Sequence, residues 1–209
     1  MEHLDSEKEQ LEKIKHWLQE NGLSIVLGIV LGLGGVYGWR GWQSYQAGVA
    51  EEYSARITSI ENHLSADRLD QAVTQAQKLI AEAGNELYVN MSRLLLARAY
   101  VDQGELDKAA EPLANIVADK DSPLKTIAAL RLARIYLSQA KLDAASQLIP
   151  STTDGAYAQA FAELKGDIAQ ARGQHDAARS AYEQAIALAN NDPSNQFLQM
   201  KLEAVPVTE

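Results

Sequence analysis

The chain of 209 residues contains no cysteine, which excludes structural disulfides, cysteine-based zinc sites and thiol catalysis. This absence suits either side of a cell membrane, so it leaves the compartment open. Beyond residue 43, proline, glycine and runs of β-branched residues are also sparse, while Ala, Leu, Gln and Glu dominate. That composition favours helix nearly throughout and predicts few strands.

Clustered positive charge is missing as well. The formal net charge of -9 divides into -3 for residues 1–21, with three Lys against six acids, and -6 for the remainder. Because phosphate binding requires clustered cations, we expect no nucleic acid among the partners.

The sequence has few groups that could carry out chemistry. The four histidines are scattered, so we expect no metal site: His3, His16, His63 and His175. His175 takes the Leu position of a repeated segment described below, which favours a packing role. Serine-hydrolase elbows, zinc-binding H-E-x-x-H helices and phosphate-binding Gly-Lys-Ser/Thr turns are absent. We therefore predict no enzyme, no catalytic residues and no cofactor.

An uncharged run of nineteen residues from Asn21 to Trp39 predicts a transmembrane helix over residues 21–42, because a spanning helix needs about 20 mostly apolar residues. Aromatic side chains at both ends resemble interfacial belts: Trp17, Tyr37, Trp39, Trp42 and Tyr45. A cleaved signal peptide is the alternative. The acidic segment before the run, its length and its bulky aromatic end all argue against cleavage.

Small residues recur along one face of this predicted span, at Ser24, Gly28, Gly32 and Gly35. Such a stripe lets another helix approach closely, which predicts a helix-packing face. The alternative is that glycine is simply more common in membrane helices than in soluble ones.

Flanking charge predicts the orientation of the span. Lys8, Lys13 and Lys15 precede it, whereas only Arg40 and Arg56 follow within about 20 residues, so residues 1–20 are expected to be cytoplasmic. Apolar residues at near-helical spacing in that segment indicate a short amphipathic helix, with a solvated tail as the alternative: Leu4, Leu11, Ile14 and Leu18.

Four short segments repeat along the second part of the chain: RLDQA at 68–72, ELDKA at 105–109, KLDAA at 141–145 and QHDAA at 174–178. Their Asp residues are separated by 37, 36 and 33 positions, and their final Ala residues keep the same intervals. Such periods are typical of arrays of helical hairpins. We expect each Asp in the first turn of a second helix and each Ala packed against the helix before it.

The repeats resemble the tetratricopeptide repeat family, which has a small residue followed by an aromatic, an Ala and a large residue at fixed spacings. Two units fit well: Ala97, Tyr100, Ala109 and Leu113, then Ala133, Tyr136, Ala145 and Ile149. Two units are looser: Gly166, Ala169, Ala178 and Tyr182, and Ile60, His63, Ala72 and Ala76. The early Trp of the family is missing throughout.

The expected fold is all-α: a single N-terminal transmembrane helix followed by a tetratricopeptide-like α-solenoid of about four helical hairpins and a capping helix. The repeat domain is expected to cover residues 43–204, with a tail at 205–209. Its helices are predicted at 43–65, 68–83, 86–103, 105–118, 123–139, 141–149, 155–173 and 174–190, with the cap at 194–204.

Read together, anchor and repeats resemble the YfgM-like family of ancillary Sec translocon subunits of Gram-negative bacteria. The short strings that carry the resemblance occur in order: E20-N21-G22, G38-W39-R40-G41-W42, L130-R131-L132-A133-R134 and Q199-M200-K201. The resemblance implies a single-pass protein of the inner membrane with a periplasmic repeat domain. Its implied partners are the SecYEG channel, a membrane-anchored periplasmic prolyl isomerase, and emerging unfolded proteins that are passed to chaperones.

Two other functions stay open at this point. One is a cell-envelope scaffold that assembles through its own repeats, and the other is a regulator acting through its cytoplasmic tail.

The tetratricopeptide resemblance also implies that the first helix of each repeat lines a concave, protein-binding groove. The residues mapped there are Met91, Leu94, Arg98, Val101, Ile127, Leu130, Arg134 and Leu137. The alternative is ordinary core packing, because the middle helices of a short solenoid have neighbours on both sides. In that case Arg98 and Arg134 should pair internally with acids such as Glu163 or Asp167.

Overall fold

The computed structural model describes residues 2–150, 155–189 and 194–206, and within these residues it contains only helices. The predicted all-α class is confirmed. In chain order the helices are α1 (Glu2–Ser65), α2 (Leu69–Glu82), α3 (Glu86–Asp102), α4 (Leu106–Ala118), α5 (Lys125–Ser138), α6 (Leu142–Gln147), α7 (Ala158–Ala171), α8 (His175–Leu188) and α9 (Ser194–Glu203). The chain divides into two compact units, Met1–Glu52 and Tyr53–Glu209.

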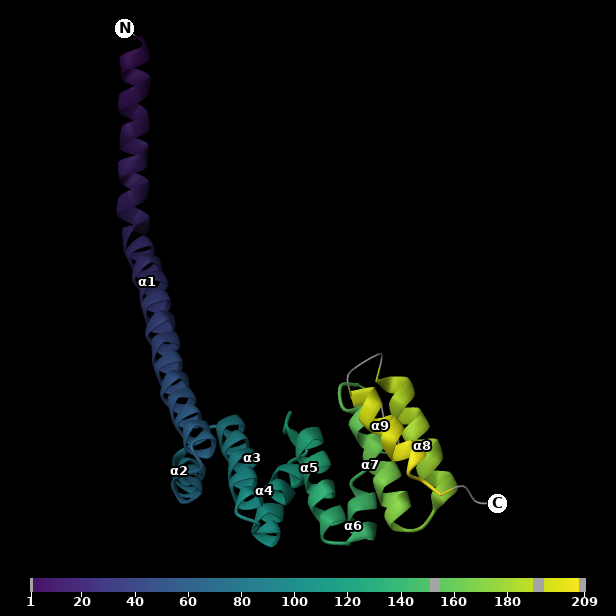
Figure 1. The fold of residues 1–209 in the computed structure, drawn as a ribbon. Helices are drawn as coiled ribbons and strands as arrows, with labels where there is room; N and C mark the ends of the chain where they lie inside the picture. The colour runs from purple at the N-terminus through teal and green to yellow at the C-terminus, as the bar shows by residue number, and fades with distance from the viewer. Residues whose placement is uncertain (1, 151–154, 190–193, 207–209) are drawn as a thin grey trace. The chain divides into compact units, whose positions relative to one another are not determined.

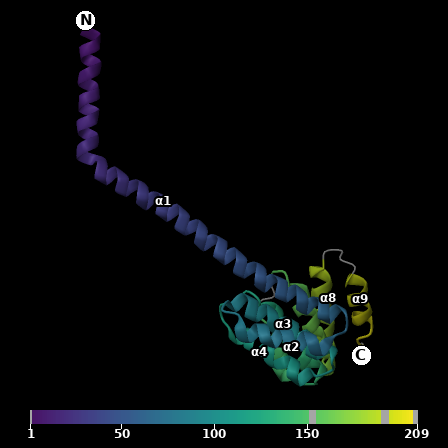
Figure 2. The same cartoon turned by 90° about the vertical axis from the view of Figure 1, so that its left-hand side faces the viewer.

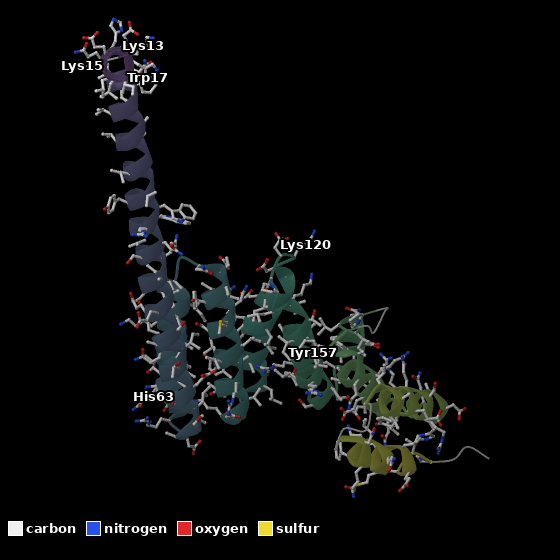
Figure 3. The ribbon with its side chains drawn as sticks, turned by 90° about the horizontal axis from the view of Figure 1, so that it is seen from above. Lys13, Lys15, Trp17, His63, Lys120 and Tyr157 are labelled. Carbon is white, nitrogen blue, oxygen red and sulfur yellow. The ribbon has the colours of Figure 1, made fainter. Side chains whose placement is uncertain are left out.

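The first unit consists of most of α1, and its apolar side chains are uncovered. Leu23 is 76% exposed and Val30 is 61% exposed. The side chains of Lys13, Lys15 and Trp17 project outward from the same helix (Figure 3). Among the apolar residues of the expected amphipathic segment, Leu11, Ile14 and Leu18 are exposed, and the side chain of Leu4 lies outside the described residues.

The membrane prediction receives limited support from helix geometry. Within the described residues, no single helix passes as a membrane span by length and apolar character. The segments Leu11–Ser24 and Val26–Ser65, which meet at a 43° bend, pass together on the same criteria.

One predicted boundary is corrected. The sequence predicts a spanning helix that ends near residue 42 and a separate repeat helix from residue 43, but α1 continues to Ser65. Residues 40–52 contain no proline and no capping sequence that would stop the helix. The isolated glycines there weaken a helix without ending it.

The second unit, Tyr53–Glu209, is a linear array in which each helix packs on its neighbours along the chain (Figures 1 and 2). It starts with the end of α1, where Ile57, Ile60 and Leu64 pack with residues of α2 and α3. Separate apolar clusters then form between successive helices up to α9. Among the described residues, each cluster joins three successive parts of the chain, so the array is a solenoid rather than a single-core domain.

The repeated Ala residues occupy the tightest positions of this array. Ala72, Ala109, Ala145 and Ala178 are each 0% exposed. Ala109 shares a cluster with Ala97 of the preceding helix, and Ala145 shares one with Ala133. The packing role predicted for them is confirmed.

The repeated Asp residues lie in the first turns of α2, α4, α6 and α8, as predicted. The structure adds a second role, because three of them accept a hydrogen bond from the next repeat. Asp70 Oδ1 accepts from Gln103 Nε2 at 2.9 Å, Asp107 Oδ1 from Gln139 Nε2 at 3.0 Å, and Asp143 Oδ1 from Arg172 Nη2 at 2.6 Å. These bonds form a ladder between successive hairpin turns.

Each hairpin turn also repeats one backbone geometry. A residue with positive φ stands three positions before each repeated Asp, namely Asp67, Gly104, Ala140 and Gly173. In the second repeat, Gly104 N–H donates to the Val101 carbonyl and Glu105 N–H to the Tyr100 carbonyl; the other turns repeat the pattern. This is the Schellman ending, which places a left-handed residue after the helix and normally selects glycine.

Ala140 therefore occupies a position that suits glycine. At φ 56° its Cβ is strained, and left-handed geometry costs an L-residue about 1–2 kcal/mol. Glycine at this position would relieve the strain, but the larger conformational entropy of glycine in the unfolded state would offset part of the gain in stability. We predict that Ala140→Gly raises the free energy of unfolding by about 0.5–1 kcal/mol, measured by circular dichroism of the full chain in mild detergent. The matched change Ala114→Gly, at an exposed position inside α4, should lower it by about 1 kcal/mol.

The fourth repeat replaces the small and large pair of its predecessors with Gly166 and Tyr182. Tyr182 is 1% exposed, and a Cβ on Gly166 would lie 2.5 Å from its Cε1 atom. The phenol is held in place, because its hydroxyl lies 2.8 Å from both Asp167 Oδ1 and Gln170 Oε1. The looser match to the repeat motif here thus reflects two linked changes: glycine replaces the small alanine, and the space it leaves is filled by the larger tyrosine ring.

This exchange predicts strong coupling between the two positions. Gly166→Ala should cost about 1–3 kcal/mol by overpacking against the ring. Tyr182→Leu alone should also destabilise, through lost burial. The double variant recreates the Ala and Leu pair of the second repeat, so its loss should be smaller than the sum of the single losses by about 1 kcal/mol or more. Additive losses in denaturant titrations would show that the two side chains do not compete for space.

Candidate protein-binding groove

A groove of about 450 Å³ lies between α3, α4 and α5 and is lined by three residues of the predicted site, Arg98, Val101 and Arg134. We call it the arginine groove. The other lining residues come from the same three helices: Ala97, Leu106, Leu113, Arg131, Ile135 and Ser138. Its volume falls within the range of about 300–1,000 Å³ typical of ligand pockets.

The floor of the arginine groove is apolar and part of the core. Ala97, Leu113 and Ile135 are 2%, 1% and 6% exposed, and all three belong to the cluster that joins α3, α4 and α5. Val101 is more open, at 42% exposed. A binding segment would therefore meet an apolar surface on which Val101 is exposed and Leu106 is partly exposed.

The charged residues that line the groove are all arginines. Arg98 Nε lies 3.6 Å from Asp102 Oδ2, an i,i+4 contact between exposed side chains that is longer than a hydrogen bond. Arg131 and Arg134 are exposed and form no ion pair or hydrogen bond with the other residues that the structure describes. The guanidinium groups therefore face solvent above an apolar floor.

Arg131 is a lining residue that the sequence mapping missed. The repeat motif places Arg98 of α3 and Arg134 of α5 in the groove and leaves out the residue one turn earlier in α5. Arg131 precedes Arg134 by three positions, and such residues share a helix face. That spacing was the available signal.

One predicted lining residue is corrected. Leu130 is 3% exposed and packs in the cluster formed by α5, α6 and α7, so its side chain belongs to the core and not to the lining of the arginine groove. Four others are partly buried against core clusters and do not line the arginine groove: Met91, Leu94, Ile127 and Leu137.

The acids named as internal partners for the arginines are engaged elsewhere. Lys201 Nζ of α9 lies 2.7 Å from both Glu163 Oε1 and Asp167 Oδ1 of α7. Burial alone would lower the pKa of Lys201, but its hydrogen bonds to these two carboxylates and their charges raise the pKa above its ordinary value. Burial, assisted by Asp167, raises the pKa of the Tyr182 phenol as well. This cluster fastens α9 to α7 and α8.

In the described part of the chain, no group of three or more His, Asp or Glu residues could hold a metal ion. His63 and His175 lie at the end of α1 and the start of α8, in different repeats.

The small-residue stripe predicted in α1 has no neighbouring helix among the residues that the structure describes. Ser24 is exposed, and a Cβ at Gly28, Gly32 or Gly35 would meet no atom within 4 Å.

The architecture defines the class first: this is a helical-repeat solenoid preceded by a long N-terminal helix. Two crystal structures of a Podosopora anserina protein with nearly identical TPR-like repeats share the fold, with TM-scores of 0.59 and 0.57. They are 20% and 21% identical, and each match covers 71% of this chain and 82% of the other.

Sequence comparison then narrows the class. A family model for the tetratricopeptide repeat-like domain matches residues 15–207. The chain is 32% identical to the ancillary SecYEG translocon subunit of Escherichia coli strain K12, over 97% of this chain and 98% of the relative. Subunits of the same name from Haemophilus influenzae and Aggregatibacter actinomycetemcomitans are 28% and 30% identical, over 94% and 88% of this chain and 96% and 91% of theirs.

The chain therefore belongs to the tetratricopeptide repeat-like family and, within it, to the family of ancillary SecYEG translocon subunits.

The exposure of the arginines yields a stability prediction. Arg98→Glu combined with Arg134→Glu should change the melting temperature of the full chain little, because surface substitutions usually alter stability by less than about 0.5 kcal/mol. Leu130→Ala in the same helix should cost about 2–5 kcal/mol as a core truncation. A loss for the arginine pair that approached the Leu130 loss, measured by thermal circular dichroism, would return these residues to a core role.

Proposed function

We propose that this protein is a membrane-anchored, non-catalytic subunit associated with the SecYEG translocon. Residues 21–42 cross the inner membrane with residues 1–20 in the cytoplasm, and the repeat domain lies in the periplasm. There it binds secreted proteins as they emerge and helps pass them to chaperones, including a membrane-anchored prolyl isomerase.

The observation that carries this proposal is the extent of the similarity to relatives named as ancillary SecYEG translocon subunits. The match to the Escherichia coli protein covers 97% of this chain, so it includes both the N-terminal helix and the repeats. A likeness confined to the repeats would support only a general protein-binding role.

The anchor is supported by side-chain exposure. The Leu and Val side chains of α1 from Leu23 to Val36 are all more than half exposed, and charged residues are absent from Asn21 to Trp39. Exposed apolar surface on this scale normally marks a membrane or protein contact. Aromatic Trp39 and Trp42, with ring centroids 5.2 Å apart, stand where an interfacial belt is expected.

The arginine groove supports the binding part of the proposal. It combines an apolar floor with charged groups that find few partners within the domain, as interaction surfaces do.

Affinity purification from membranes in mild detergent tests the association. The full chain should recover SecYEG subunits in stoichiometric amounts. Gly28→Leu combined with Gly32→Leu should reduce that recovery several-fold while leaving membrane insertion intact, because leucine blocks close helix approach but raises hydrophobicity.

Val26→Leu combined with Val30→Leu serves as the matched control, since it alters the span away from the small-residue stripe and should leave recovery unchanged. Recovery of copies of this chain without channel subunits would favour a self-assembling scaffold instead. Unchanged recovery with the glycine variant would remove the stripe from the interface.

A further inference from the structure

The arginine groove has the opposite charge to the domain that contains it. Residues 53–209 carry 15 Lys and Arg against 20 Asp and Glu, a net charge of -5, yet the charged lining residues are Arg98, Arg131 and Arg134. A local concentration of one charge in an oppositely charged domain attracts a complementary ligand and repels a similar one. The ligand of this groove should therefore carry negative charge.

The pairing capacity of these arginines is largely unused. Arg131 and Arg134 have no ionic partner among the described residues, and Arg98 has only the exposed Asp102 at 3.6 Å. A guanidinium group binds carboxylates in a planar, often bidentate geometry. The groove can accept several carboxylates without breaking an existing buried ion pair.

The apolar floor limits the ligand further. A small anion would leave the accessible surface of Val101 and Leu106 uncovered, whereas an amphipathic segment would cover it. A nucleic acid would have to approach a net negative domain through only three lining cations, and its affinity depends on many phosphate contacts. The combination fits a polypeptide that presents acids beside an aliphatic side chain.

We propose that the arginine groove binds an acidic amphipathic segment of a partner protein. Its carboxylates pair with Arg98, Arg131 and Arg134, and an aliphatic side chain packs on Val101 and Leu106. This inference rests on the proposed function, since it specifies the chemistry of the segment that the groove holds.

A peptide-binding experiment on the full chain in mild detergent tests the charge requirement. The probe is a fluorescent 15-residue peptide of Glu and Leu with amphipathic helical spacing, compared with the same peptide carrying Gln in place of Glu. The Glu peptide should bind about tenfold or more tightly at low salt, as expected from several exposed ion pairs, and high salt should reduce this difference.

Matched variants test the location. Arg98→Gln, Arg131→Gln and Arg134→Gln together should weaken the Glu peptide about tenfold or more. The control variant combines Lys78→Gln, Lys120→Gln and Lys165→Gln, at three exposed lysines that do not line the groove. It removes the same amount of charge and should change the affinity less than about twofold. Lys120 lies at the turn between α4 and α5 (Figure 3).

A gain of binding gives an independent check. Asp102→Asn removes the acid beside Arg98 and should tighten the Glu peptide about two- to fivefold. If the triple arginine variant does not fold, Arg134→Gln alone should still weaken binding while Asp102→Asn strengthens it.

Equal binding of the Glu and Gln peptides, or equal losses in the arginine and lysine triple variants, would overturn the inference. Both results are separable from the proposed function, because recovery of SecYEG subunits from membranes is measured without the peptide. An arginine variant that no longer bound the peptide but still recovered SecYEG subunits would show that the groove binds a partner or client and is not needed for association with the channel.

Discussion

Close approach of neighbouring helices at small side chains is the constraint on which the repeat domain depends. The four repeated alanines are completely buried, and each lets the second helix of a hairpin lie against the first. Where the first helix carries alanine, as in the second and third repeats, the large residue is Leu113 of α4 or Ile149, which follows α6. Where it offers Gly166, the second helix returns the larger Tyr182. In the fourth repeat, the larger ring therefore fills the space that the smaller residue leaves.

The packing of the helices also determines which side chains remain available for binding a partner. Once one face of α3 and α5 is committed to the clusters with α4 and the neighbouring hairpins, the remaining face presents Arg98, Val101 and Arg134 above the core. The ladder from Gln103 to Asp70 and from Gln139 to Asp107 links successive turns, so the first helices keep a fixed register. The groove is thus a consequence of repeat packing rather than a separate structural element.

Most of the fold could be predicted from the sequence, because the period of the Asp and Ala residues fixes the hairpins directly. Predicted and observed helix ends from α2 onward agree within a few residues. The sequence does not predict the continuity of α1, because its charge and aromatic pattern marks a change of environment near residue 42 and not a change of backbone. Likewise, Leu130 and Arg131 could not be assigned to core and groove by motif position alone, since that depends on where α7 packs against α5.

The contact of Lys201 of α9 with Glu163 and Asp167 of α7 depends on three-dimensional context in the same way, because no repeated motif predicts it. The central claim is that the exposed face of α3 and α5 contacts partner proteins at the translocon. Site-specific photo-crosslinking in intact cells tests it most directly, with the crosslinker at Val101 of the full chain and a control at Ala187, an exposed position of α8. The account predicts crosslinks from Val101 to a translocon subunit, a translocating protein or a membrane-anchored chaperone, and few from Ala187. Equal crosslinking at the two positions, or none at Val101, would contradict it.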